Sequence, residues 1–163
     1  MTTKLNLLIA SLIFCATLSG CQTGGSTGAR PDNAPSAVPP GMNSNGEVID
    51  ASKVQSGSGK SVKGINDFEG EITGVAASNS RFAQLQIGMS IRQALDICGP
   101  PNDQGAYITG KAFIPFYFGS DRSRFELIYR GQGRLIFAGG SVGNYSGGNL
   151  IWIINSASES GYR

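Results

Sequence analysis

Residues 85–101 read LQIGMSIRQALDICGPP and contain the clearest helix signal in the chain. Ser90, followed three residues later by Gln93, has the pattern of a capping box, in which two residues satisfy backbone N–H groups at a helix N-terminus. The apolar residues after it recur at the spacing of one helical face: Ile91, Ala94, Leu95 and Cys98. Gly99 suits the left-handed residue that follows a helix, and Pro100 cannot continue one. The stretch therefore predicts a short helix between Ser90 and Gly99.

Sequence on either side of this helix predicts the rest of the fold. Ser80 can cap an earlier short helix that passes through Phe82 and Leu85 and ends at Gly88. Four further segments have strand character: 67–75, 113–118 as an edge strand containing Pro115, a hairpin over 125–138 that turns at 131–133, and 150–154. We therefore expect an α+β fold, with two short helices packed on a three- to four-stranded antiparallel sheet in a two-layer sandwich.

The N-terminus has the order of a secretory signal. Lys4 precedes the apolar run Leu5–Leu18, and small residues follow it. That run is shorter than the roughly 20 residues of a membrane-spanning helix. Residues 18–21, Leu-Ser-Gly-Cys, resemble the lipobox of bacterial lipoproteins. The resemblance implies that residues 1–20 are a signal peptide and that Cys21 is acylated. Gln22, in place of an aspartate, further implies the periplasm-facing side of the outer membrane in a Gram-negative bacterium.

Composition divides the remaining chain into three parts. Residues 21–63 are rich in Gly, Ser, Pro and Asn, and too poor in large apolar residues to offset the entropy of ordering. We interpret them as the lipidated cysteine and a disordered tether. A folded domain is then expected over 64–155. Residues 156–163 are expected to form a flexible C-terminal tail.

The composition also limits the chemistry. The chain has 13 Lys and Arg, 11 Asp and Glu, and no histidine. A balanced charge does not indicate nucleic-acid binding. Without histidine, the commonest general base and transition-metal ligand are missing. We therefore expect a protein that is not an enzyme, with no catalytic residue, cofactor or metal. Signal cleavage and acylation would leave Cys98 as the remaining cysteine, so no disulfide is expected within the chain.

Three other features have alternative interpretations. Gly57–Ser61 resembles a phosphate-binding loop, but Val54 replaces the required first glycine and the strand–helix context is missing. Cys98 could be a nucleophile, but a buried core position fits its place on the apolar helix face better. A cluster of arginines could contact lipid headgroups or an acidic partner, although a solvated sheet face is favoured: Arg122, Arg124, Arg130 and Arg134.

The helix stretch carries a second resemblance. Gly88-Met89-Ser90 before the helix, and Gly99 with Pro101 after it, resemble the signature of the BamE family, also called the SmpA/OmlA-like domain. The resemblance implies a helix pair packed on a three-stranded antiparallel sheet. It also implies an accessory lipoprotein of β-barrel outer-membrane protein assembly, whose partners are barrel-assembly components.

Two functions follow as hypotheses. The first is a non-catalytic, lipid-anchored interaction module that supports barrel assembly or envelope integrity. The second is an inhibitor-like or small-ligand-binding envelope lipoprotein. The second is motivated by the glycine-rich segment Gly139–Gly148, which is unusual relative to compact members of the family.

Overall fold

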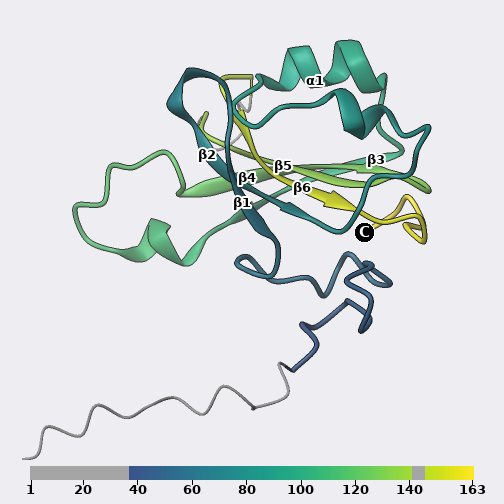
Figure 1. Ribbon diagram of the computed structural model, residues 1–163. Helices are drawn as coiled ribbons and strands as arrows, with labels where there is room; N and C mark the ends of the chain where they lie inside the picture. The colour runs from purple at the N-terminus through teal and green to yellow at the C-terminus, as the bar shows by residue number, and fades with distance from the viewer. Residues whose placement is uncertain (1–36, 141–145) are drawn as a thin grey trace, which may run out of the picture. The chain divides into compact units, whose positions relative to one another are not determined.

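The computed structural model describes residues 37–140 and 146–163, and its centre is a six-stranded mixed sheet (Figure 1). The strands are β1 (Lys60–Lys63), β2 (Glu69–Thr73), β3 (Asp103–Ile108), β4 (Ser123–Tyr129), β5 (Gly133–Ala138) and β6 (Asn149–Asn155). Their order across the sheet is β1-β2-β6-β5-β4-β3. Neighbouring strands are antiparallel except β2 and β6, which run parallel.

One α-helix, α1 (Ile91–Cys98), lies over the sheet within the described residues. The predicted capping box is confirmed, because the Ser90 hydroxyl accepts from Gln93 N and the Gln93 side chain accepts from Ser90 N. Three short 3-10 turns accompany it: η1 (Ile65–Asp67), η2 (Arg81–Gln84) and η3 (Gly110–Phe113). Ser80 caps η2 through a bond to Phe82 N, as its position predicted, but the segment forms only this turn.

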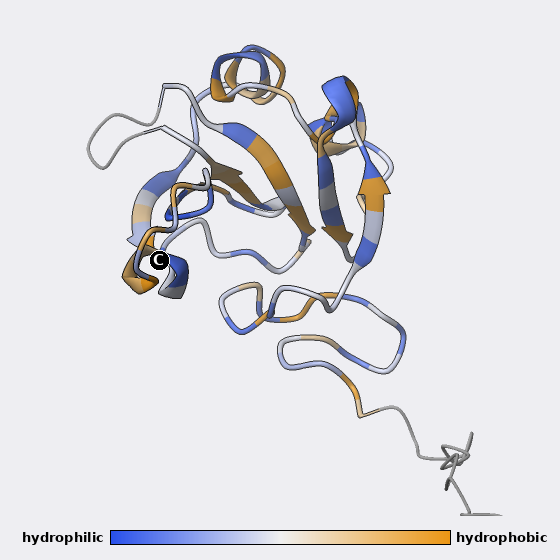
Figure 2. Cartoon of the chain, turned by 90° about the vertical axis from the view of Figure 1, so that its left-hand side faces the viewer, coloured by the Kyte–Doolittle hydropathy of each residue, from blue (hydrophilic) through white to orange (hydrophobic). Residues whose placement is uncertain are grey.

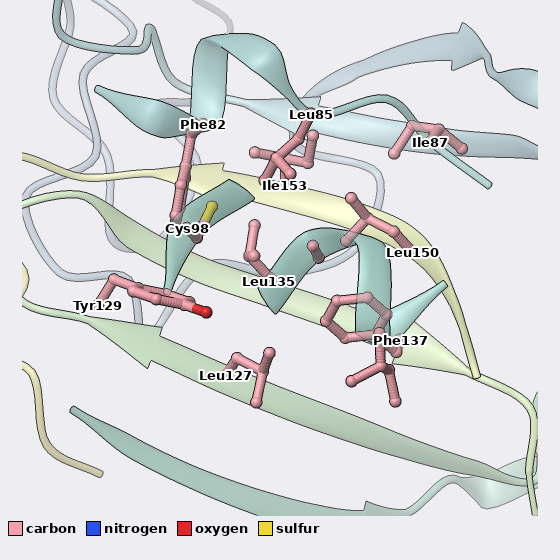
Figure 3. Close-up of a cluster of buried hydrophobic side chains, with 12 residues drawn as sticks. Phe82, Leu85, Ile87, Cys98, Leu127, Tyr129, Leu135, Phe137, Leu150 and Ile153 are labelled. Atoms are coloured by element: carbon pink, nitrogen blue, oxygen red, sulfur yellow. The ribbon is translucent and has the colours of Figure 1, made fainter. Parts of the chain in front are cut away.

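The main core lies between α1, η2 and one face of the sheet (Figure 3). Cys98 is buried in this core, as predicted, and its pKa is raised by burial to about 11. Phe82 meets Tyr129 edge to face, with 5.5 Å between the ring centroids. Alternate strand residues such as Leu127 and Tyr129 supply the sheet side of this core, and Figure 2 shows hydrophobic stretches along the strands. The other buried members include Leu135, Phe137, Leu150 and Ile153.

A second, smaller core covers the opposite face of the sheet. Val48 and Ala51 are buried there against β5 and β6. The sheet side of this contact consists of Ile136, Trp152 and Ile154. The described part of the folded unit begins at residue 37 and includes Val48 and Ala51. The predicted boundary at residue 63 between tether and folded domain is therefore too far along the chain. A few apolar residues in this polar segment, such as Val48 and Ala51, are enough to cover the second face of the sheet.

The predicted fold class is wrong in its sheet and in its helices. The sheet has six strands and includes a parallel pair, and only one helix exceeds a 3-10 turn in the described chain. Strands β1 and β3 were not predicted, because β1 is a short polar segment and the apolar residues of β3 are consecutive and show no alternation. The aromatic run over 113–118, predicted as a strand, belongs to η3 and a loop. The hairpin β4–β5 and the last strand β6 are confirmed.

The C-terminal residues 156–163 are packed against the fold and do not form the predicted flexible tail. Ser156 is buried and donates from its hydroxyl to Val48 O at 3.1 Å. Glu159 is also buried, and Arg163 N donates to the Asp103 carboxylate at 3.1 Å. These bonds link the C-terminus to both the segment before β1 and the far edge of the sheet.

Candidate interaction site

The residues of the predicted signature hold α1 in place. Gly88 has φ of 92°, and an added Cβ would lie 2.6 Å from Ile65 O, so a side chain would not fit there. Its N–H donates to Leu150 O, and Leu150 N donates back to Met89 O, each at 2.7 Å. Ser90 caps α1 at its start. These contacts bind the helix entry to β6.

At the other end of the helix, Gly99 has φ of 77° and donates to Leu95 O at 2.7 Å. Pro101 follows and is partly exposed. The structure thus gives the signature residues structural roles at the two ends of α1. Cys21, the expected lipidation site, lies outside the described residues.

Arg134 does not contribute to a free cationic surface. It is buried on the second face of the sheet, between Glu126 at 3.1 Å and Glu159 at 2.6 Å. Burial would lower the pKa of Arg134, but the hydrogen bonds that it donates to Glu159 and the charge of Glu126 outweigh this effect and raise the pKa. The group is a satisfied ion cluster that fixes the C-terminal residues to β4 and β5.

The other three arginines also differ in environment. Arg130 donates to Ser160 O and to the Tyr162 hydroxyl, each at 3.0 Å, and lies 5.3 Å from the Tyr162 ring centroid. Arg124 forms an ion pair with Asp121, whereas Arg122 is exposed. The predicted arginine cluster therefore separates into three arginines with different structural partners, Arg124, Arg130 and Arg134, and the exposed Arg122. The sequence did not reveal the partners of Arg130 and Arg134 in residues 156–163, because these residues were expected to form a flexible tail.

A loop that follows β3 carries the strongest apolar exposure of the described chain. We call residues Phe113–Phe118 the aromatic loop. Phe113, Phe116 and Phe118 are 79%, 90% and 86% exposed, and Ile114 is 52% exposed. The edge strand predicted over 113–118 implies that alternate aromatic residues face the core. That interpretation is wrong, because these side chains point away from both cores.

The base of the aromatic loop is fixed by a polar cluster. The Thr109 hydroxyl donates to Asp121 O at 2.5 Å, and Thr109 N donates to Arg122 O at 2.9 Å. The Asp121 carboxylate accepts from Lys111 and Arg124, each at 2.8 Å. Burial would raise the pKa of Asp121, but hydrogen bonds from Arg124 and Lys111 lower it overall. The loop therefore has a fixed base and exposed apolar side chains.

The two edges of the sheet are protected differently. Strand β1 carries the exposed lysines Lys60 and Lys63, and charges of this kind oppose pairing with another strand. Within the described residues, strand β3 pairs only with β4, and it is uncharged from Gln104 to Ile108. Thr109 N donates to Arg122 O, so the backbone groups of Thr109 face the neighbouring chain. Backbone groups along an antiparallel strand alternate in direction, so those of Ala106 and Ile108 point toward the free edge.

A cleft of about 560 Å³ opens on the second face of the sheet, between residues 56–59 and residues 120–121, which follow the aromatic loop. Glu71 and Trp152 are among its lining residues. The Glu71 carboxylate accepts from Gly57 N at 2.7 Å and Gly59 N at 2.5 Å. The backbone donors that a phosphate-binding loop would offer are thus taken by an internal carboxylate. Strand β1, rather than a helix, follows them.

Within the described residues, no group of three potential metal ligands lies together, and no helix is long and apolar enough to cross a membrane. Comparisons with protein-family models, curated proteins and solved structures found no match for this chain.

Proposed function

We propose that this chain is a non-catalytic, lipid-anchored interaction module at the periplasmic face of the outer membrane, which supports β-barrel assembly or envelope integrity. The lipobox-like sequence at Cys21 supports the anchor. The signature over Gly88–Pro101 supports the association with barrel-assembly components. The structural observation that carries the proposal is the open edge of β3.

The β3 edge is suited to an extended segment of a partner protein. A peptide that adds a strand to a sheet gains backbone hydrogen bonds from the free edge and specificity from alternate side chains. Ala106 offers outward backbone groups, and the neighbouring Tyr107 and Ile108 side chains are 37% and 56% exposed. The lysine-bearing β1 edge opposes the same contact. The partner should therefore bind at β3.

Site-specific photocrosslinking in intact envelopes tests this assignment. A photoreactive residue at Gln104, on the β3 edge, should capture barrel-assembly components. The same residue at Lys63, on the β1 edge, is the matched control and should not. A strain without the protein should also contain less outer-membrane barrel protein. Equal or absent capture at the two positions, with unchanged barrel-protein levels, would overturn the proposal.

A backbone variant separates edge pairing from general damage. Ala106→Pro removes an N–H that faces away from β4, so the ladder keeps its bonds while an added strand loses one. Ala106→Ser keeps that N–H and is the control. We expect Ala106→Pro, but not Ala106→Ser, to abolish the capture at Gln104. Capture that persists in Ala106→Pro would place the partner elsewhere.

Binding of a small ligand is the second candidate, and the cleft beside Trp152 favours it. About 560 Å³ is within the usual size range of small-molecule sites. The segment Gly139–Gly148, which motivated this hypothesis, lies partly outside the described residues. A ligand in the cleft should change the fluorescence of Trp152, the chain's one tryptophan. An envelope extract that leaves this emission unchanged would argue against it.

A further inference from the structure

We infer that the aromatic loop is a second membrane contact, which inserts its exposed side chains into the interface of a lipid bilayer. The inference rests on the proposed lipid anchor at Cys21, because that anchor brings the loop to the membrane. It assigns the loop and the β3 edge to different partners: the loop to lipid, and the edge to protein.

The apolar character of the loop supports insertion. Phe113, Phe116 and Phe118 are each at least 79% exposed and lie within a stretch of six residues. Contiguous apolar exposure of this kind marks a binding or membrane surface in a soluble domain. The side chains project singly from a loop and do not line a groove, so they can enter a fluid interface without a complementary protein surface.

The loop is also preorganised for such a contact. Turn bonds join Ala112 N to Thr109 O at 3.0 Å and Tyr117 N to Ile114 O at 3.2 Å. Phe116 lies inside the second of these turns with a positive φ of 61°, and its side chain is 90% exposed. With the base fixed by Asp121, little conformational freedom remains to be lost on binding.

Charge at the two ends of the loop fits a bilayer surface. Lys111 precedes the aromatic residues and its side chain is 52% exposed beside Asp121. Arg122 follows them and is exposed. Cations that flank a group of inserted aromatic residues can meet the phosphates of lipid headgroups. This arrangement favours an anionic lipid surface over a second copy of this chain, whose matching loop would carry the same cations.

The position of the folded unit gives a further argument. Its described part begins at residue 37, close in sequence to Cys21. Covalent geometry limits the distance between Cys21 and residue 37 to about 55 Å, at about 3.5 Å per residue. A boundary at residue 64 would have allowed nearly three times that distance. The acyl anchor therefore confines the folded unit to the region next to the bilayer, where a weak second contact is effective.

Vesicle binding of the full mature chain with Cys21→Ser tests the inference without the acyl group. Vesicles of phosphatidylethanolamine and phosphatidylglycerol should bind this chain. The double variant Phe116→Ser and Phe118→Ser should weaken the binding at least about tenfold, because each buried aromatic side chain contributes a comparable factor. Val75→Ser removes a side chain that is 82% exposed outside the loop, and it should leave the binding unchanged.

The outcomes distinguish the partners. No vesicle binding, or equal binding by the double variant, would overturn the inference. A concentration-dependent dimer that Phe116→Ser dissociates would assign the loop to a second copy of the chain. Photocrosslinking at Gln104 remains a separate readout, so the proposed protein contact can fail or succeed independently of the lipid contact.

Discussion

Arg134 forms ion pairs with two buried carboxylates on the second face of the sheet, and its charge stabilises them in the absence of water. Its side chain is 9% exposed, and those of Glu126 and Glu159 are 12% and 3% exposed. Replacing Arg134 with methionine would leave both carboxylates without their cation. We predict that Arg134→Met lowers the free energy of unfolding by about 3–5 kcal/mol, the usual cost of breaking a buried ion pair. Urea denaturation would measure this change.

The combined variant Arg134→Met, Glu126→Gln and Glu159→Gln is the matched control. It removes the charges together with the cation, so it should recover much of the lost stability. A single variant Arg134→Met that unfolds at the same urea concentration as the natural chain would contradict the structural role of this cluster.

Cys98 illustrates how burial controls a reactive side chain. Burial raises the pKa of this thiol to about 11, and the thiolate is the form that reacts with alkylating reagents. In the mature chain with Cys21→Ser, Cys98 is the one cysteine left. We predict slow alkylation of the folded chain near pH 8 and rapid alkylation in urea, measured by mass spectrometry. Similar rates in both conditions would show that the thiol is accessible.

The capping box at the start of α1 should contribute measurably to stability. Ser90→Ala removes the hydroxyl that accepts from Gln93 N, and we predict a loss of about 1 kcal/mol in the free energy of unfolding. Ser90→Asp keeps an acceptor at the same position and should retain most of the stability. Thermal or urea unfolding would compare the two variants. Equal losses in both would mean that the cap does not stabilise the helix.

Local signals explain why some elements could be predicted from the sequence. The capping box at Ser90 depends on residues three apart, and the hairpin β4–β5 depends on alternation around Gly131. Both patterns lie within one short window. The parallel pairing of β2 with β6 joins residues such as Ile72 and Ile153, which are distant in sequence. No local pattern specifies that contact, so the sheet was predicted too small.

The candidate site was harder to predict for a related reason. Strand β3 contains a glycine, and its apolar residues Ala106, Tyr107 and Ile108 are consecutive, so no alternating pattern indicates a strand. The aromatic loop over 113–118 has the composition of a strand but is fixed as a loop by Thr109 and Asp121. Its exposure depends on contacts beyond the run itself. The sequence therefore drew attention to these aromatic residues and placed them in the wrong environment.

Both faces of the sheet are covered only when the two ends of the folded unit meet. Ser156 and Ser158 donate hydroxyl bonds to the backbone of Val48 and Ile49, at 3.1 and 3.0 Å. Val48 and Ala51 in turn cover Trp152, whose indole N–H donates to the Thr73 hydroxyl at 2.9 Å. The segment before β1 is thus part of the fold and should be required for its stability.

We predict that a chain starting at Ser36 folds cooperatively, whereas one starting at Gly64 is strongly destabilised. The shorter chain lacks β1, Val48 and Ala51, so Ile136 and Trp152 lose their cover and apolar surface is exposed. The emission of Trp152 should shift to longer wavelength, and urea should unfold this chain at a lower concentration. The variant Val48→Asp in the longer chain tests the same contact, because it places a charge against Trp152 with the segment still present. Identical emission and unfolding for the two chain lengths would mean that the folded unit starts near residue 64 and does not depend on the second core.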